Sequence, residues 1–453
     1  MGPVVLLWFD VEDYINEESD DALLALLQML AAKGVRGTFK LVGEKVRALE
    51  ARGCSDILDA LKHQAIGYHT DLHSQHPTVS EYCEPQGFAA GAALFERREA
   101  GGLEDLRRLL PVPVSTYGQP GASWAAQAFP VLRKWQIPTY VDSIDIIDLD
   151  QDPFWFCGIL TVTHIRGTLR MALNEQGLDE AIRRFDQLVA DGERLISIYY
   201  HPCEFATAEF WDAVNFKRGS DTPRERWKRS RLRAPGEMER DVQQLGRWID
   251  HMLARQSMFL GTDELMGAPG FGSADSDLYV TKADVRALAA GWREAVNYAF
   301  CQDSWLCASE IFSLLGAAFC GQEPVPVFAY GPERRVKSDD GAAGLPEDYR
   351  TALQAAWPRV MGEPQLPECF ILNGKRVSPV DMACTVATML CEPPDPNQSV
   401  PVVRGVLAPE RHVSDNRHFG DRWVIFPENW TADGVLETTR LQTWTLKPAA
   451  WRA

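Results

Sequence analysis

The feature that most constrains the fold is a repeated alternation of short apolar runs and helical patterns up to about residue 265. The first run, Val4–Phe9, is continuously apolar, as expected of a parallel strand buried on both faces. Leucines at helical spacing follow in residues 19–32, and Gly34 is suited to end that helix. Further strand patterns lie at Val35–Val42, Ala65–Tyr68, Val112–Tyr117, Thr139–Val141, Leu160–Ile165, Leu195–Tyr200 and Met258–Leu260. Repeated β-α units of this length predict a parallel barrel or a doubly wound sheet.

The second part of the chain has a different pattern. Residues 267–276 contain three glycines and a proline and are expected to be a linker. Beyond them helical patterns predominate, and no catalytic constellation is apparent. We therefore expect a catalytic domain at 1–266 and a mainly helical accessory or dimerisation domain at 277–453, through which the protein would form a homo-oligomer.

Composition limits the classes of partner and the cellular location. The chain has 453 residues and a net charge of −17, which argues against nucleic acid as a general partner. No tract is long enough to span a bilayer, and the apolar start has neither a basic flank nor a cleavage site of a signal peptide. The ten cysteines form no CxxC pair, which favours reduced thiols. A cytoplasmic protein without a membrane partner is expected.

Polar residues gather where the expected strands end. Asp10, Glu12, His69, Tyr117 and His201 all lie at or just after the carboxyl end of a strand pattern. In parallel α/β folds these strand ends meet on one side of the sheet, where functional groups collect. We therefore expect these side chains to share one site.

Two of these strand ends have the composition of a divalent-metal site. Alternation places Asp10 and Glu12 on the same side of an extended segment. His69 and His73, four residues apart, share either a helix face or the two sides of a tight loop. Imidazole nitrogen and carboxylate oxygen are ligands that zinc accepts, and a catalytic site keeps one position for water. One carboxylate can bind the metal while the other accepts a proton.

The same residues resemble the polysaccharide deacetylase (NodB-homology) family over about residues 3–266. The run from His69 to His73 reads HTDLH and matches the family's H-[ST]-x-x-H motif. Residues 9–14 are similar to a first motif with two acidic residues, residues 34–43 to the second strand, and residues 196–202 to a late segment with a histidine. The resemblance implies an irregular (β/α) barrel in which Glu12, His69 and His73 bind the metal. Asp13 is the alternative to Glu12.

The family's chemistry implies a role for each remaining group. Asp10 would act as the base, His201 as the acid, and one divalent ion, zinc before cobalt, nickel or iron, would activate water. Tyr117 and Pro120 lie in the third motif, where a backbone amide near Tyr117 would hold the oxyanion, and Trp211 is a candidate for stacking on a sugar.

The third motif also departs from the family pattern. Gly118 stands where the family has an arginine that orients the base. The expected activity is removal of an N-acetyl group from an amino sugar or glycan. Two alternatives are a metal-dependent amidase acting on a small cytoplasmic amide and a non-catalytic descendant that binds carbohydrate.

Overall fold

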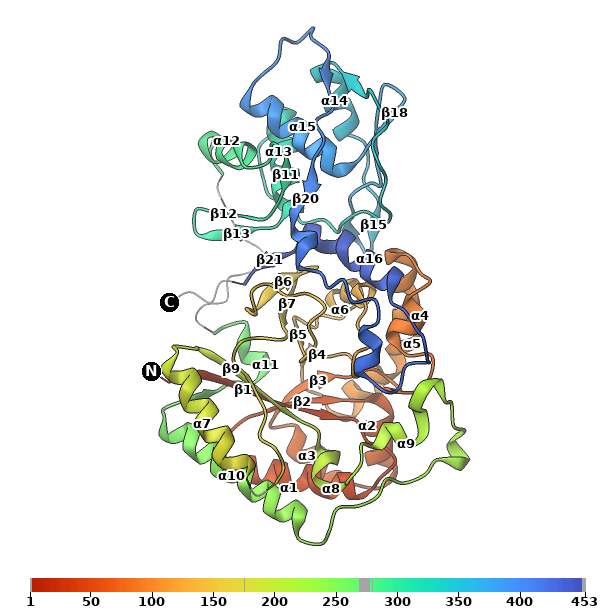
Figure 1. Cartoon of the computed structure of the whole chain (residues 1–453), viewed down its shortest axis with the longest axis vertical. Coiled ribbons are helices and arrows are strands. Elements are labelled where there is room, and N and C mark those ends of the chain that lie inside the picture. Colours follow the sequence, from red (N-terminus) through yellow and green to blue (C-terminus); the bar gives the residue numbers. More distant parts are fainter. Residues whose placement is uncertain (1, 175, 269–277, 279, 450–453) are drawn as a thin grey trace.

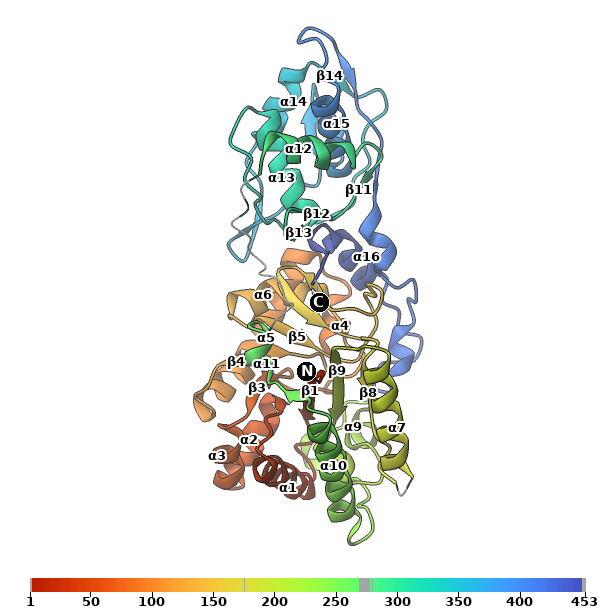
Figure 2. The ribbon, with the colours of Figure 1, turned by 90° about the vertical axis from the view of Figure 1, so that its left-hand side faces the viewer.

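The molecule consists of two lobes stacked along its long axis (Figures 1 and 2). The computed structural model describes residues 2–449 apart from 175, 269–277 and 279. Most of the expected linker therefore lies outside the described residues. The first lobe contains residues 2–268, the second lobe residues 278–407, and residues 408–449, here called the return segment, run back to the first lobe. Among the described residues, no helix combines the length and the apolar character needed to cross a membrane.

A single mainly parallel sheet organises the first lobe. Within the described residues it has eleven strands in the order β21-β6-β7-β5-β4-β3-β2-β1-β9-β8, and β10 also pairs with β1. Only the pairs β6–β7 and β21–β6 are antiparallel. The strands are β1 (Val4–Val11), β2 (Thr38–Leu41), β3 (Ala65–Tyr68), β4 (Val114–Tyr117), β5 (Thr139–Val141), β6 (Phe154–Phe156), β7 (Ile159–Val162), β8 (Thr168–Leu169), β9 (Leu195–Tyr200), β10 (Met258–Phe259) and β21 (Lys447–Pro448).

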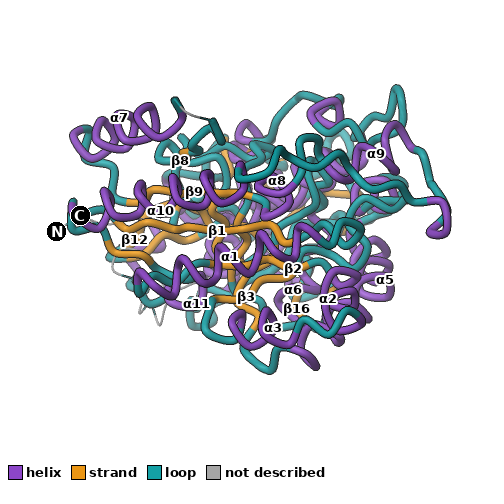
Figure 3. The backbone as a smooth tube through the Cα atoms, turned by 90° about the horizontal axis from the view of Figure 1, so that it is seen from below, coloured by secondary structure: helices purple, strands orange, loops and turns teal. Residues whose placement is uncertain are grey.

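Helices between the strands cover this sheet. Figure 3 shows α1 and α10 lying over the strands around β1 when the molecule is seen from below. The helices are α1 (Glu18–Lys33), α2 (Gly43–Ala51), α3 (Ser55–Leu61), α4 (Val79–Cys83), α5 (Phe88–Leu109), α6 (Phe129–Lys134), α7 (Gly177–Ala190), α8 (Pro202–Ala206), α9 (Trp211–Phe216), α10 (Glu237–Ala254) and α11 (Thr262–Leu265). Every residue of β1 is buried, which explains its continuous apolar run. The predicted irregular (β/α) barrel is confirmed.

The described residues of the second lobe contain four α-helices with a hydrophobic core of their own. These helices are α12 (Lys282–Ala290), α13 (Ala308–Phe319), α14 (Pro346–Leu353) and α15 (Pro379–Cys391). The hairpin of β12 (Ala299–Cys301) and β13 (Ser304–Leu306) precedes α13, and the hairpin of β17 (Phe370–Leu372) and β18 (Lys375–Val377) precedes α15. Short two-strand sheets complete it, namely β11 (Ala295–Val296) with β20 (Val406–Leu407), β14 (Ala343–Gly344) with β19 (Val400–Pro401), and β15 (Arg359–Val360) with β16 (Glu363–Pro364).

The return segment packs on the first lobe. Its helix α16 (Asp433–Gln442) lies between the lobes in Figure 1, and its strand β21 extends the large sheet through β6. The indole N–H of Trp124 donates to Thr439 Oγ1 at 3.0 Å, and Val413 forms a bridge with Ile147. Val435 and Leu436 are part of the first lobe's hydrophobic core. The division of the chain into 1–266 and 277–453 stays a prediction, and these contacts cross it.

Candidate metal centre and catalytic cleft

Three of the expected ligands converge at the carboxyl ends of β1 and β3. Glu12, His69 and His73 are buried, and their ligand atoms all lie within 4.8 Å of one another. Glu12 Oε2 is 2.8 Å from His73 Nε2 and 3.4 Å from His69 Nε2. The loop after β3 that carries both histidines is not helical, and Thr70 and His73 adopt positive φ angles of 67° and 55°. Such backbone conformations are costly for residues other than glycine and recur at functional sites.

The contacts around these three side chains suit a metal. His69 Nδ1 lies 2.9 Å from the Gly118 carbonyl oxygen, to which it can donate, and His73 Nδ1 lies 2.5 Å from Ser74 Oγ. Among the described residues, neither Nε2 atom makes a hydrogen bond of acceptable geometry, although both are buried. Fixing Nδ1 through a partner and leaving Nε2 as the ligand is the usual arrangement of metal-binding histidines. The donor set Glu-His-His therefore fits a divalent ion such as zinc.

Asp13, the alternative ligand, is engaged elsewhere. Its carboxylate accepts hydrogen bonds from the backbone N–H groups of Ile15 and Asn16 at 3.0 and 2.9 Å and from the Asn16 amide at 2.7 Å. Burial raises the pKa of this carboxyl group, although the nearby Lys45 ammonium acts in the opposite direction. These bonds hold the turn that leads into α1, so Glu12 is the acidic member of the cluster.

Asp10 and His201 face each other beside the cluster. Asp10 Oδ2 lies 3.7 Å from His201 Nε2, and His201 Nδ1 contacts Glu204 Oε2 at 3.0 Å. Burial alone would lower the pKa of His201, but the carboxylates of Glu204, Glu12 and Asp10 outweigh it and raise the pKa to about 9. The imidazole is thus held in its protonated form at neutral pH, as an acid requires.

The three expected substrate-binding residues, Tyr117, Pro120 and Trp211, are all buried. Tyr117 is only 1% exposed and packs among Tyr68, Phe95 and Tyr140, so it does not face the cleft. The prediction followed the strand end, but the pleat turns this ring into the core. Pro120 is also buried, although its neighbours Gln119 and Gly121 line the cleft. The Gly118 amide near Tyr117, a candidate for the oxyanion, already donates to the Tyr68 carbonyl at 3.2 Å.

Trp211 contacts the candidate ligand cluster from the interior. Its side chain is fully buried, and its indole N–H donates to Glu12 Oε1 at 2.8 Å. The predicted stacking on a sugar is therefore wrong, because no face of this ring reaches solvent. The contact instead fixes the second oxygen of Glu12, which leaves Oε2 for the histidine side.

The cleft above the cluster has a volume of about 380 Å³ and includes residues that the sequence did not suggest. Trp423 and Arg422 of the return segment form one wall. The Trp423 ring stands edge-on to His73 at 5.6 Å, and its indole N–H donates to Asp212 Oδ2 at 2.9 Å. Trp423, and not Trp211, is thus the indole that borders the cleft. No local pattern announces it, since the contact joins positions 211 residues apart.

Lys40 is the second residue that sequence reasoning missed. It lies in β2 opposite Asp10 in the adjacent strand, is fully buried, and places Nζ 2.9 Å from Asp10 Oδ1. Its signal was present: a lysine between Phe39 and Leu41 in an apolar strand needs an anionic partner in the interior.

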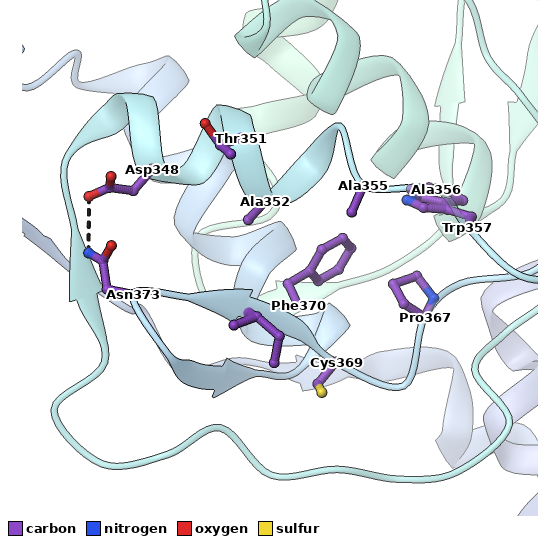
Figure 4. Close-up of a pocket in the computed structure, with 11 residues that line it drawn as sticks. Asp348, Thr351, Ala352, Ala355, Ala356, Trp357, Pro367, Cys369, Phe370 and Asn373 are labelled. Carbon is purple, nitrogen blue, oxygen red and sulfur yellow. Dashed lines mark hydrogen bonds between the residues drawn. The ribbon is translucent and has the colours of Figure 1, made fainter.

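A second cavity, of about 400 Å³, lies in the second lobe between α14 and the β17–β18 hairpin (Figure 4). Trp357, Phe370 and Ile371 line it, and Asn373 Nδ2 donates to Asp348 Oδ2 at 3.0 Å at one end. Among the described residues that line this cavity there is no histidine, whereas Glu12 and His73 of the candidate metal cluster line the first cleft.

No protein-family model and no curated protein sequence matches the chain. Solved structures do match. These structural neighbours include a CE4 domain, a family 4 carbohydrate esterase and two deacetylases.

Three of these structures illustrate the level of likeness. A CE4 family pseudoenzyme from Bacillus anthracis has 13% identity and a TM-score of 0.32, over 57% of this chain and 63%, less than two thirds, of its own. The CE4 domain of a multidomain xylanase from the hindgut metagenome of Trinervitermes trinervoides has 12% identity and a TM-score of 0.32, over 59% and 91%. A family 4 carbohydrate esterase from Streptomyces lividans has 13% identity and a TM-score of 0.30, over 57% and 91%. A likeness at this level says nothing about the activity of this chain.

Proposed function

We propose that the protein is a metal-dependent deacetylase that hydrolyses the N-acetyl amide of an amino sugar or glycan. One observation carries the proposal: Glu12, His69 and His73 converge as a candidate ligand set, and Asp10 and His201 lie 3.7 Å apart in the cleft beside them. Amide hydrolysis needs these three functions, namely activated water, a base and an acid for the leaving amine.

The side chains divide the reaction between them. A divalent ion held by Glu12, His69 and His73 would polarise the acetyl carbonyl and make bound water more acidic. Asp10 accepts a proton from the water that adds to the carbonyl carbon. His201 donates a proton to the amide nitrogen as the C–N bond breaks, so that acetate and a free amine leave. Its protonated state at neutral pH suits this step.

The size and the lining of the cleft suit a small ligand that has polar groups and one apolar face. Its volume of about 380 Å³ falls in the usual range for small-molecule sites. Tyr199, Phe210 and Trp423 contribute aromatic surface, while Arg170 and Ser143 contribute polar groups at the rim. We propose that the acetamido group enters beside Asp10 and that the sugar ring lies against the Trp423 wall.

The test of this proposal combines metal content with product release. We expect purified protein to bind about one equivalent of zinc by elemental analysis, and the loaded protein to release acetate from N-acetylated oligosaccharides. A panel of small soluble amides run in parallel distinguishes the amidase alternative. Metal binding without acetate release from either panel would reject the enzymatic proposal and favour a carbohydrate-binding protein.

The pairing of His201 with Glu204 predicts a defined pH dependence. Burial alone would raise the pKa of Glu204, but the positive charges of His201 and Arg170 lower it to about 2. Replacing Glu204 with glutamine removes the nearest anion, which stabilises the imidazolium. The pKa of His201 should then fall, and the alkaline limb of kcat should move to lower pH by about one to three pH units.

A profile of kcat against pH measures this shift. Glu209→Gln is the matched control, because Glu209 is exposed nearby and its carboxylate contacts the Arg231 backbone. It should leave the limb in place. If the alkaline limb of the kcat profile stays at the same pH in Glu204→Gln, that limb reports the titration of a group other than His201.

A further inference from the structure

The sequence buries one lysine completely at the centre of the catalytic edge of the sheet. Lys40 Nζ lies 2.9 Å from Asp10 Oδ1 and 3.5 Å from Asp142 Oδ2, and it donates to the Val141 carbonyl oxygen at 2.8 Å. The ammonium also lies 4.1 Å from the centre of the Trp8 ring. All of its close partners are thus anions, a carbonyl or an aromatic face, which together offset the cost of burying a charge.

Two glycines leave space for this side chain, one in β3 and one just after β4. Gly67 is the partner of Lys40 in β3, and a Cβ there would come within 2.7 Å of Lys40 Cγ. A Cβ on Gly118, just after β4, would collide with Lys40 Nζ itself. The lysine therefore extends from β2 across β3 and β4 towards Asp142 at the end of β5. The family that the sequence resembles has an arginine at position 118, and here the Lys40 ammonium occupies the space next to Gly118.

We propose that Lys40 is the positioning residue that orients Asp10 as the base, in place of an arginine at position 118. The inference rests on the proposed function. The Lys40 ammonium forms an ion pair with Oδ1 of the carboxylate, and Oδ2 is the oxygen nearer to His201. Lys40 itself does not line the cleft, so it acts on the substrate only through Asp10.

The main test replaces Lys40 with methionine, which has a similar length but no charge. We expect kcat to fall about 10- to 100-fold, as when an outer partner of a catalytic group is removed, with KM and bound zinc unchanged. Lys40→Arg should retain more activity than Lys40→Met, although methionine is closer in shape. A lysine that serves only packing would give the opposite order.

The control is another buried lysine with a carboxylate partner. Lys447 Nζ lies 2.9 Å from both oxygens of Glu310, in the contact between β21 and the second lobe. Lys447→Met should lower the melting temperature and leave kcat per folded molecule unchanged. If Lys40→Met does not fold, the double variant Lys40→Met/Asp142→Asn removes one charge of each sign and should fold with the same low kcat.

The outcomes separate the two proposals. A wild-type protein that binds zinc but releases no acetate would overturn the function and this inference with it. If the wild type is active and either Lys40→Met or the double variant is equally active, the proposed role of Lys40 is wrong but the proposed function stands. Loss of zinc from Lys40→Met would also overturn it, because the residue would then support the metal ligands and not the base.

Discussion

Replacing His69 with alanine is expected to abolish zinc binding and to reduce acetate release by at least about 10²- to 10³-fold, the scale of losing one principal stabiliser of the transition state. The reason is geometric: His69 Nε2 and His73 Nε2 both face Glu12 Oε2, and two remaining ligands would leave the ion too weakly held. Elemental analysis and an acetate assay on the same preparation measure both effects. Circular dichroism should show an intact fold.

His76→Ala is the matched control for this variant. His76 lies on the same loop, but its ring contacts Glu81 at 2.8 Å and the Phe216 carbonyl at 3.1 Å, away from the cluster. Its removal should leave zinc content unchanged and lower stability at most modestly. If His69→Ala kept its zinc and its activity, the proposed metal centre would be wrong.

Replacing Asp10 with asparagine should reduce kcat about 10²- to 10⁴-fold, the range typical of losing a general base. Asparagine keeps the shape of aspartate but cannot accept the proton of the attacking water. Zinc should remain bound, because Asp10 is not a member of the ligand set. Titration with zinc and measurement of kcat on the loaded variant separate the loss of the base from the loss of the metal.

Asp13→Asn distinguishes the two acidic residues that follow Asp10. Its carboxylate accepts three hydrogen bonds in the turn before α1, so the variant should be less stable but should bind zinc and turn over substrate. If Asp13→Asn loses zinc and Glu12→Gln retains it, Asp13 and not Glu12 is the metal ligand.

Strand ends were the part of the site that the sequence could predict. Asp10, Glu12, His69 and His201 follow apolar runs, and parallel strands bring such positions to one edge regardless of loop detail. The direction of a side chain at a strand end is less certain, since one step along the strand reverses it. Tyr117 shows this, because its ring enters the core.

Contacts made through buried polar groups were not predictable in the same way. Trp211 follows the strand end at His201 and was predicted to stack on a sugar, yet its indole N–H donates a hydrogen bond to Glu12. Lys40 belongs to a strand that was recognised, but its ion-pair partner depends on the register of β1 and β2 and on the space left by Gly67 in β3 and Gly118 just after β4. Both assignments need three-dimensional neighbours that the local pattern does not contain.

The return segment contributes to both the core and the cleft of the first lobe. A fragment cut at the linker would keep Asp10, the three ligands and His201 but would lose Trp423, the hydrogen bond to Asp212 and the outermost strand pair of the sheet. Its cleft would lack one side, and the apolar surface beneath β21 and α16 would be exposed to water. Engineering of this protein should therefore keep residues 408–449 together with the first lobe, because the second lobe is inserted between two stretches of chain that pack on each other.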